Sequence, residues 1–89
     1  MGIEWDPEKA EENRRKHGVD FTDAAAVFGD PQRISAEDPQ AEGEQRFITV
    51  GMDRIGRMVT VVYTYRERRV RMISARRATR KERGDYAGR

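Results

Sequence analysis

Met58-Val-Thr-Val-Val-Tyr-Thr-Tyr65 is the most apolar and β-branched stretch of this 89-residue chain. Because β-branched and aromatic side chains fit a pleated, half-buried surface, the stretch predicts the central strand of a sheet. Other stretches with strand-type alternation lie on both sides of it, separated by segments rich in Gly, Asp, Pro or charge: 33–37, 46–52 and 70–76. Together these strands predict an antiparallel meander.

The N-terminal end predicts a short strand over 3–5 and a helix over 7–17. Asp6 in the N-cap position and Pro7 in the first helical position begin this helix, and Gly18 ends it. One row at helical spacing contains a single apolar residue: Ala10, Asn13 and His17. Hydrophobic burial alone therefore cannot hold this helix against the rest of the fold.

A second helix follows, capped by Asp20 or Thr22 and ended by Gly29 and Pro31. Its apolar residues have the i, i+3, i+4, i+7 spacing of a core stripe: Phe21, Ala24, Ala25 and Phe28. This spacing predicts a helix that packs on the sheet.

Near the C-terminus, Thr79 and Glu82 form a capping-box pattern that predicts the start of a short helix. Gly84 and Gly88 weaken this helix, so we expect it to fray. The predicted elements form one α+β domain over residues 1–89, with two N-terminal helices packed on the meander and a short C-terminal helix.

The composition is 36% hydrophobic and 38% charged, with no cysteine. No stretch resembles a membrane span and no apolar run near the N-terminus resembles a signal peptide, so we expect a cytoplasmic protein that does not bind a membrane. Disulfides and thiolate metal sites are excluded. Since a chain of this length buries only about 60 to 65% of its unfolded surface, the core is thin.

The net charge of +2 hides a strong asymmetry between two parts of the chain. Residues 1–65 carry 8 basic and 13 acidic side chains, a balance of −5, whereas residues 66–89 carry 10 basic and 3 acidic ones, a balance of +7. All but one of the C-terminal cations are arginines, whose planar fork matches phosphate and carboxylate oxygens in pairs. The C-terminal third therefore favours nucleic acid or an acidic protein as partner, and the alternative is a solvated charged face.

Several kinds of site are excluded by residue type or spacing. One histidine without cysteine cannot form a zinc site, and the carboxylates lack the spacing of a calcium loop. Gly51 and Gly56 are not followed by Lys-Ser/Thr and do not precede a helix, so a hairpin turn explains them better than a phosphate-binding loop. We expect neither a metal nor an organic cofactor.

Cleavage of RNA needs no metal, because the substrate supplies its own 2′-hydroxyl as nucleophile. The protein must supply a proton acceptor, a proton donor for the leaving 5′-oxygen, and cations for the phosphoryl oxygens. The candidates for proton transfer are His17 and Glu44, because histidine and carboxylate side chains exchange protons readily. The candidate cations are Arg46, Arg76 and Arg77.

Each candidate has a structural alternative. His17 at a helix C-terminus can bond to free carbonyls, Glu44 can pair with a basic neighbour, and Arg46 can be a solvated strand residue. Arg76 and Arg77 are the sharper candidates, because they lie where an apolar strand gives way to a helix. In a regular strand they point to opposite faces, so only one of them reaches a given phosphate, and we prefer Arg76.

The chain resembles a known family over nearly its whole length. The residues that carry the first half of the resemblance are Trp5-Asp6, Lys9-Ala10, Asn13, Lys16-His17-Gly18-Val19, Phe21, Ala24, Phe28 and Asp30. The second half rests on Glu44, Arg46, Gly51, Val62-Tyr63-Thr64, Arg71-Met-Ile-Ser-Ala-Arg-Arg-Ala-Thr79, Glu82-Arg83 and Tyr86. In this combination they resemble the BrnT toxin family; Met72 stands where the pattern leads us to expect Ile.

The resemblance implies a RelE-like fold and a ribonuclease that blocks translation. It also implies a partner, a BrnA-type antitoxin with a ribbon-helix-helix part, which forms a heterotetramer with the toxin and binds operator DNA on behalf of the complex. By matching position, the family's arginine pair falls on Arg76 and Arg77, while the general base stays open between His17 and Glu44. Four further cations are predicted to bind RNA phosphates: Arg46, Arg71, Arg80 and Lys81.

Two other functions compete with the endoribonuclease hypothesis. One is a non-catalytic protein of a repressor complex that binds nucleic acid or antitoxin, although no base-reading element such as a helix-turn-helix is evident. The other is an inactive toxin that only holds its antitoxin. A neighbouring reading frame for a ribbon-helix-helix protein, and growth arrest on induction without it, would favour the toxin.

Overall fold

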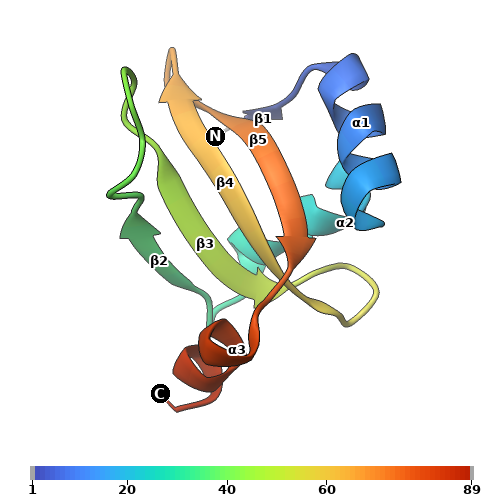
Figure 1. Ribbon diagram of the computed structural model, residues 1–89, viewed down its shortest axis with the longest axis vertical. Coiled ribbons are helices and arrows are strands. Elements are labelled where there is room, and N and C mark those ends of the chain that lie inside the picture. The colour runs from blue at the N-terminus through green and yellow to red at the C-terminus, as the bar shows by residue number, and fades with distance from the viewer. Residues whose placement is uncertain (1, 89) are drawn as a thin grey trace.

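The computed structural model describes residues 2–88 as a five-stranded sheet with helices on both sides (Figure 1). In chain order the elements are β1 (Ile3–Glu4), α1 (Pro7–His17), α2 (Phe21–Ala24), the 3₁₀ helix η1 (Ala25–Gly29), β2 (Ile34–Glu37), β3 (Phe47–Met52), β4 (Met58–Arg66), β5 (Arg69–Arg77) and α3 (Arg80–Ala87). The α+β class predicted from the sequence is confirmed.

The strand order in the sheet is β1-β5-β4-β3-β2. β4 lies in the middle, as its apolar, β-branched sequence predicted, and β2 to β5 form the expected antiparallel meander. The prediction of a purely antiparallel sheet was wrong, because β1 pairs in parallel with β5, joining Ile3 to Val70 and Glu4 to Arg71. This pairing joins residues 67 positions apart, so no local pattern reveals it.

The core lies between the sheet and the segment that α2 and η1 form. Its fully buried residues include Phe21, Ala24 and Val27 from this segment, which are spaced by three. Three residues per turn is the period of a 3₁₀ helix, so the observed change from α2 to η1 brings Val27 inward. The prediction of a continuous α-helix to Phe28 was therefore wrong in this last turn, and Phe28 is only partly buried.

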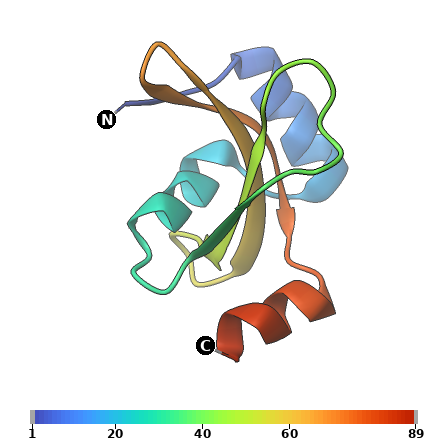
Figure 2. The same cartoon turned by 90° about the vertical axis from the view of Figure 1, so that its left-hand side faces the viewer.

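The two N-terminal helices occupy different places relative to the sheet. α2 with η1 lies across one face, whereas α1 runs beside β5 at the edge of the sheet (Figures 1 and 2). The prediction placed both helices on the sheet. The difference arises because α1 is too polar to cover an apolar face; Asn13 is its one buried residue.

The pairing of β4 with β5 contains one irregularity. Met72 pairs with Tyr63. The next pair joins Ser74 to Val62, which leaves Ile73 as the extra residue of a β-bulge. The extra residue shifts the alternation of side chains by one position. Odd-numbered residues before Ile73 therefore point to the same face of the sheet as even-numbered residues after it.

α3 begins with the predicted capping box. The Thr79 hydroxyl accepts a hydrogen bond from the Glu82 amide at 3.1 Å, and the Glu82 carboxylate accepts one from the Thr79 amide at 2.8 Å. None of the side chains of α3, all of which the structure describes, is buried. The half-buried Glu82 and Tyr86 make polar contacts that help to hold α3 against the rest of the fold.

Candidate functional site

The two faces of the sheet are covered to different extents. α2 and η1 cover one face, whereas α3 lies on the opposite side, near the C-terminal end of β5 (Figure 2). We call the face on the side of α3 the open face. The register places Thr60, Val62 and Thr64 of β4 on this face, because their neighbours Val59, Val61 and Tyr63 belong to the core.

The bulge at Ile73 brings two arginines to the open face. Arg71 and Arg76 are five positions apart and would point to opposite faces in a regular strand. With the extra residue between them, both lie on the open face. Measured through their partners on β4 they are four residues apart, a distance of about 13 Å along the strand.

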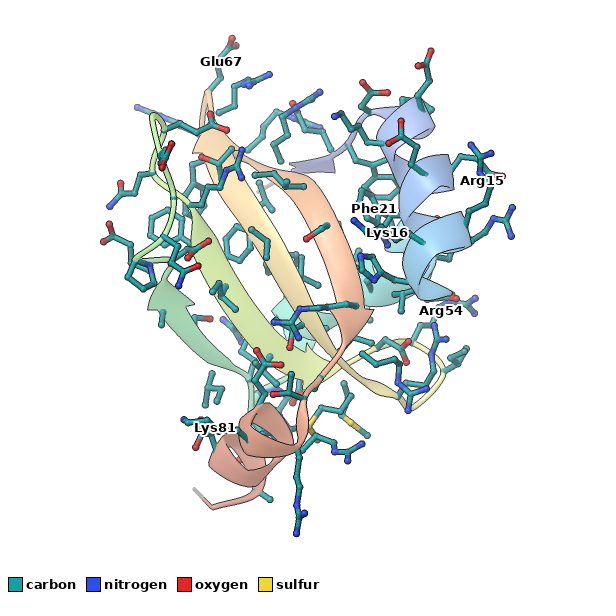
Figure 3. The ribbon with its side chains drawn as sticks, viewed as in Figure 1. Arg15, Lys16, Phe21, Arg54, Glu67 and Lys81 are labelled. Carbon is teal, nitrogen blue, oxygen red and sulfur yellow. The ribbon has the colours of Figure 1, made fainter. Side chains whose placement is uncertain are left out.

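A trough runs between α1 and β5; Arg71 lines it, whereas Arg76 does not. It consists of two adjoining hollows of about 220 and 200 Å³ that share Lys9 and Ile73. Its lining combines four cations and one histidine with two carboxylates: Lys9, Lys16, Arg46, Arg71, His17, Asp6 and Glu12. The balance is positive, so the trough suits an anionic ligand. Figure 3 shows Lys16 on the side of α1 toward β5 and Arg15 on the side away from it.

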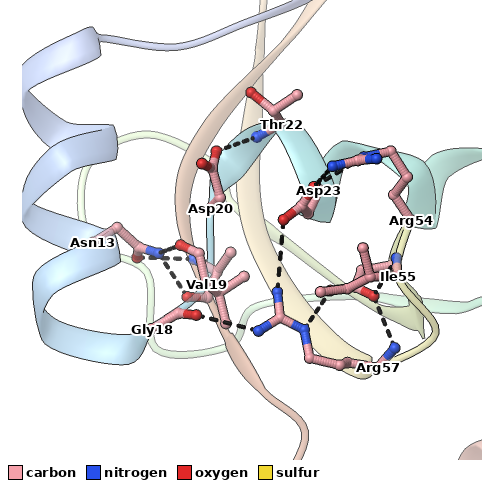
Figure 4. Close-up of polar contacts among 11 residues, drawn as sticks. Asn13, Gly18, Val19, Asp20, Thr22, Asp23, Arg54, Ile55 and Arg57 are labelled. Carbon is pink, nitrogen blue, oxygen red and sulfur yellow. Dashed lines mark hydrogen bonds and ion pairs between the residues drawn. The ribbon is translucent and has the colours of Figure 1, made fainter.

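Asn13 attaches α1 to the edge of β5. Its Nδ2 donates to the carbonyls of Val19 at 3.0 Å and Ala75 at 2.8 Å, and its Oδ1 accepts from the Ala75 amide at 3.0 Å (Figure 4). The carboxamide thus pairs with β5 as a neighbouring strand would, and it explains how a helix with a polar face is held. The position of every α1 side chain in the trough depends on this contact.

His17 ends α1 and lines the trough together with Lys16 and Ser74. Its side chain is half-buried. Gly18 follows with φ 71°, the left-handed conformation typical of a helix C-cap, and its carbonyl accepts a hydrogen bond from Arg57 Nη1 at 3.2 Å (Figure 4). The C-terminal end of α1, which carries His17, is therefore held by the Gly18 cap and by the hydrogen bond from Arg57.

The loop between β3 and β4 supports the same corner. Arg57 Nε donates to the buried carboxylate of Asp53 at 2.8 Å, and Arg54 Nε donates to Asp23 of α2 at 2.9 Å. Arg57 also lies 3.9 Å from Asp23 (Figure 4). These ion pairs are structural, since they connect a loop to the helices rather than facing the trough.

The guanidinium of Arg76 binds the carboxylate of Glu82 in α3. Its Nη1 and Nη2 donate to the two carboxylate oxygens of Glu82 at 2.7 and 2.9 Å. This bidentate contact with Arg76, with further hydrogen bonds from the Thr79 amide and the Thr60 hydroxyl, lowers the pKa of Glu82 to about 2. The strand stays regular through Arg76 and Arg77, as the preference for Arg76 required.

Arg71 and Arg46 flank the far end of the trough. Arg71 Nη1 donates to Glu4 at 2.8 Å, and Arg71 with Arg69 holds the pKa of the Glu4 carboxyl below its usual range. Arg46 differs, because within residues 2–88 its Nε is buried without a hydrogen-bond partner. Glu44 forms an ion pair with Arg46 at 3.9 Å, so the predicted structural alternative, that Glu44 pairs with a basic neighbour, is observed.

Five predicted site residues line neither hollow of the trough. One is Arg76, which is bound to Glu82 of α3. Arg77 pairs with Val59 and is exposed at the end of β5, on the side of α2. Arg80 and Lys81 are exposed on α3, where Lys81 pairs with Asp85 at 3.1 Å. The exposed Glu44 also lines neither hollow.

Lys9, Lys16 and Ser74 line the trough but were not predicted as site residues. The two lysines are seven positions apart, two helical turns, with Asn13 between them. This spacing was the available signal, since residues at i, i+4 and i+7 share a helix face. Ser74 had no such signal, because the bulge decides which way it points.

A further hollow, of about 560 Å³, lies on the other face of the sheet. Four aromatic rings line it in edge-to-face and stacked contacts: Phe28, Phe47, Tyr63 and Tyr65. Its charged lining is one arginine and one glutamate, Arg33 and Glu37. It lacks the excess of cations that distinguishes the trough.

Within residues 2–88, no group of three or more His, Asp or Glu side chains has the arrangement of a metal site. No helix in this part of the chain has the length and apolar character needed to cross a membrane.

Comparison with known proteins places these observations in context. The model of the family described as "Ribonuclease toxin, BrnT, of type II toxin-antitoxin system" matches residues 5–82. A crystal structure of the Brucella abortus ribonuclease toxin BrnT is similar in fold, with a TM-score of 0.63, 24% sequence identity, and coverage of 90% of this chain and 99% of the other. No curated protein matches the chain.

Proposed function

The chain belongs to the BrnT family of ribonuclease toxins of type II toxin-antitoxin systems, and from this premise we propose that it is an endoribonuclease that cleaves RNA without a metal, in the trough between α1 and β5. We further propose that the fold is the RelE-like arrangement that the family resemblance implies.

One observation carries the proposal. The β-bulge at Ile73 turns Arg71 and Arg76 to the same face, and the hollow that contains His17 opens beside Ser74 between them. A proton-transfer group is thus flanked by cations about 13 Å apart along β5. A single RNA strand laid along β5 would place its phosphates near the cations and one 2′-hydroxyl near His17.

His17 and Arg76 have separate roles in the proposed reaction. His17 accepts the proton of the 2′-hydroxyl as its oxygen forms a bond to phosphorus, the bond between phosphorus and the 5′-oxygen breaks, and the leaving 5′-oxygen takes up a proton from water. Arg76 stabilises the charge that grows on the phosphoryl oxygens. The position of His17 in the trough supports this residue, rather than Glu44, as the base. The position of Arg77 at the end of β5 supports a secondary role for that arginine.

Binding of the RNA backbone falls to the cations of the trough. Arg46, Arg71 and the lysines Lys9 and Lys16 line the path and give it positive charge. Arg80 and Lys81, which we predicted as phosphate ligands, lie on α3 and would contact only RNA that extends beyond the trough.

The expected partner is an antitoxin, because the family consists of type II toxin-antitoxin systems. We propose that a BrnA-type protein with a ribbon-helix-helix part covers this chain in a heterotetramer and binds operator DNA for the complex. Free toxin in the cytoplasm would then cleave RNA and inhibit translation.

A cleavage assay tests the function. Purified protein in EDTA should cut RNA, leave a 2′,3′-cyclic phosphate, and spare DNA of the same sequence, because DNA lacks the 2′-hydroxyl. His17→Ala should remove the activity, with the exposed Glu8→Ala on the same helix as control. Loss of cleavage in EDTA, or cleavage of the DNA, refutes the mechanism; RNA binding without cleavage supports the non-catalytic alternative.

A further inference from the structure

Four hydrogen-bond donors converge on the carboxylate of Glu82. Oε1 accepts from Arg76 Nη1 at 2.7 Å, and Oε2 accepts from Arg76 Nη2 at 2.9 Å. Oε1 also accepts from the Thr60 hydroxyl at 2.9 Å and from the Thr79 amide at 2.8 Å. We call these four donors the cradle.

The cradle has the chemistry of an oxyanion site. A guanidinium fork binds two oxygens of one carboxylate or one phosphate equally well. The donors come from three separate places, which are β4, the end of β5 and the amide at the start of α3. Thr60 is fully buried, so its hydroxyl reaches an anion only at the point where the Glu82 carboxylate lies.

We propose that the cradle is a phosphate-binding site of the RNA substrate, and that the Glu82 carboxylate occupies it as an internal anion until a backbone phosphate takes its place. This inference rests on the proposed ribonuclease function, since it describes how Arg76 becomes available to RNA. It adds Thr60 and the Thr79 amide to the site and makes Glu82 the competitor of the substrate.

The attachment of α3 allows this exchange. No side chain of α3 is fully buried, although Glu82 and Tyr86 are half-buried. The polar contacts of α3 with the rest of the fold include the cradle and a hydrogen bond from the Tyr86 hydroxyl to Asp30 at 2.7 Å. Release of the Glu82 carboxylate does not require the Tyr86 contact to break. One charged anion replaces another on the same donors, so the exchange loses no charge-assisted hydrogen bond at Arg76.

Protonation does not open the cradle near neutral pH. Arg76 and the other donors hold the pKa of Glu82 at about 2, so the carboxylate stays charged and bound. An anionic ligand that competes for the same donors can release it. The occupant must also lie along the trough, which favours a phosphate within an RNA strand over free phosphate.

Binding measurements on the full chain test the exchange. The probe is a short 2′-O-methyl oligoribonucleotide of mixed sequence, which has RNA phosphates but no nucleophile and is therefore not cleaved. Glu82→Gln keeps the shape of the side chain and removes the competing charge, so it should bind the probe about tenfold more tightly than the wild type. Tyr86→Phe removes a hydrogen bond of α3 that lies outside the cradle and should change affinity less than about twofold. In an Arg76→Ala background, Glu82→Gln should give no gain.

A second measurement needs no variant. The pKa of Glu82, followed by carboxyl ¹³C NMR in the wild-type chain, should rise from about 2 toward its ordinary value when the probe saturates the protein. Inorganic phosphate alone at the same phosphate concentration should cause a smaller change. If it causes the same change, the site binds free phosphate rather than RNA and the proposal is overturned.

The outcomes separate this inference from the proposed function. Tighter binding by a folded Glu82→Gln variant and a raised Glu82 pKa support the cradle even if the wild type does not cleave RNA. If the wild type cleaves RNA while Glu82 keeps its low pKa in the complex, the proposed function stands and the cradle is only a structural anchor.

Discussion

Replacing Asn13 by alanine should be one of the most damaging single changes in α1. The side chain is 6% exposed and makes three hydrogen bonds, two to carbonyls and one to the Ala75 amide. At about 1 kcal/mol each, their loss costs about 3 kcal/mol, and the better helix propensity of alanine returns about 0.5 kcal/mol. The free energy of unfolding should fall by about 2.5 kcal/mol.

Thermal melting measures this cost directly. In a domain of this size each kcal/mol shifts Tm by about 4 to 8 °C, so Asn13→Ala should melt about 10 to 20 °C lower than the wild type. Glu12→Ala is the matched control, because the Glu12 side chain is exposed at the neighbouring position and makes no hydrogen bond within residues 2–88; it should shift Tm by less than about 3 °C.

The same variant tests how His17 is positioned. If Asn13→Ala stays folded at a low temperature, α1 should separate from β5. The rate of RNA cleavage should then decrease, and the Ala75 amide should exchange its hydrogen faster than in the wild type. A variant that melts within about 2 °C of the wild type would show that Asn13 does not anchor α1, and the account of the trough would be wrong.

Three other predictions address the open face and its partner. Arg76→Ala should lower single-turnover cleavage about 100-fold to 1,000-fold, whereas the exposed Arg68→Ala should cleave normally; equal losses in both, or an unfolded Arg76→Ala, would reject the assignment. Because the pKa of Glu82 is lowered from 4.5 to about 2, the contribution of its carboxylate to stability is present above about pH 4.5 and is lost as the pH falls toward 2. The Tm values of the wild type and Glu82→Gln should therefore converge over this range. A Tm difference that stays constant with pH would contradict this prediction. Antitoxin binding should weaken with salt and protect the basic segment 66–88 from hydrogen exchange; protection of α1 alone would contradict this.

The local signals in the sequence determined the elements and part of the site. Asp6 with Gly18 set the limits of α1, the capping box of Thr79 and Glu82 began α3, and the apolar run over 58–65 identified the central strand. Each signal depends on residues within a few positions of one another, where helical or strand spacing is fixed by the backbone.

The tertiary structure decided the arrangement of the site. The parallel pairing of β1 with β5 and the carboxamide of Asn13 on Ala75 join segments far apart in the sequence, and the bulge at Ile73 depends on the register between β4 and β5. Whether a strand side chain faces the trough depends on the register of its partner, and one extra residue reverses it. For this reason the sequence could suggest Arg76 as an anion ligand, but only the folded chain brought it to the same face as Arg71 and placed Glu82 upon it.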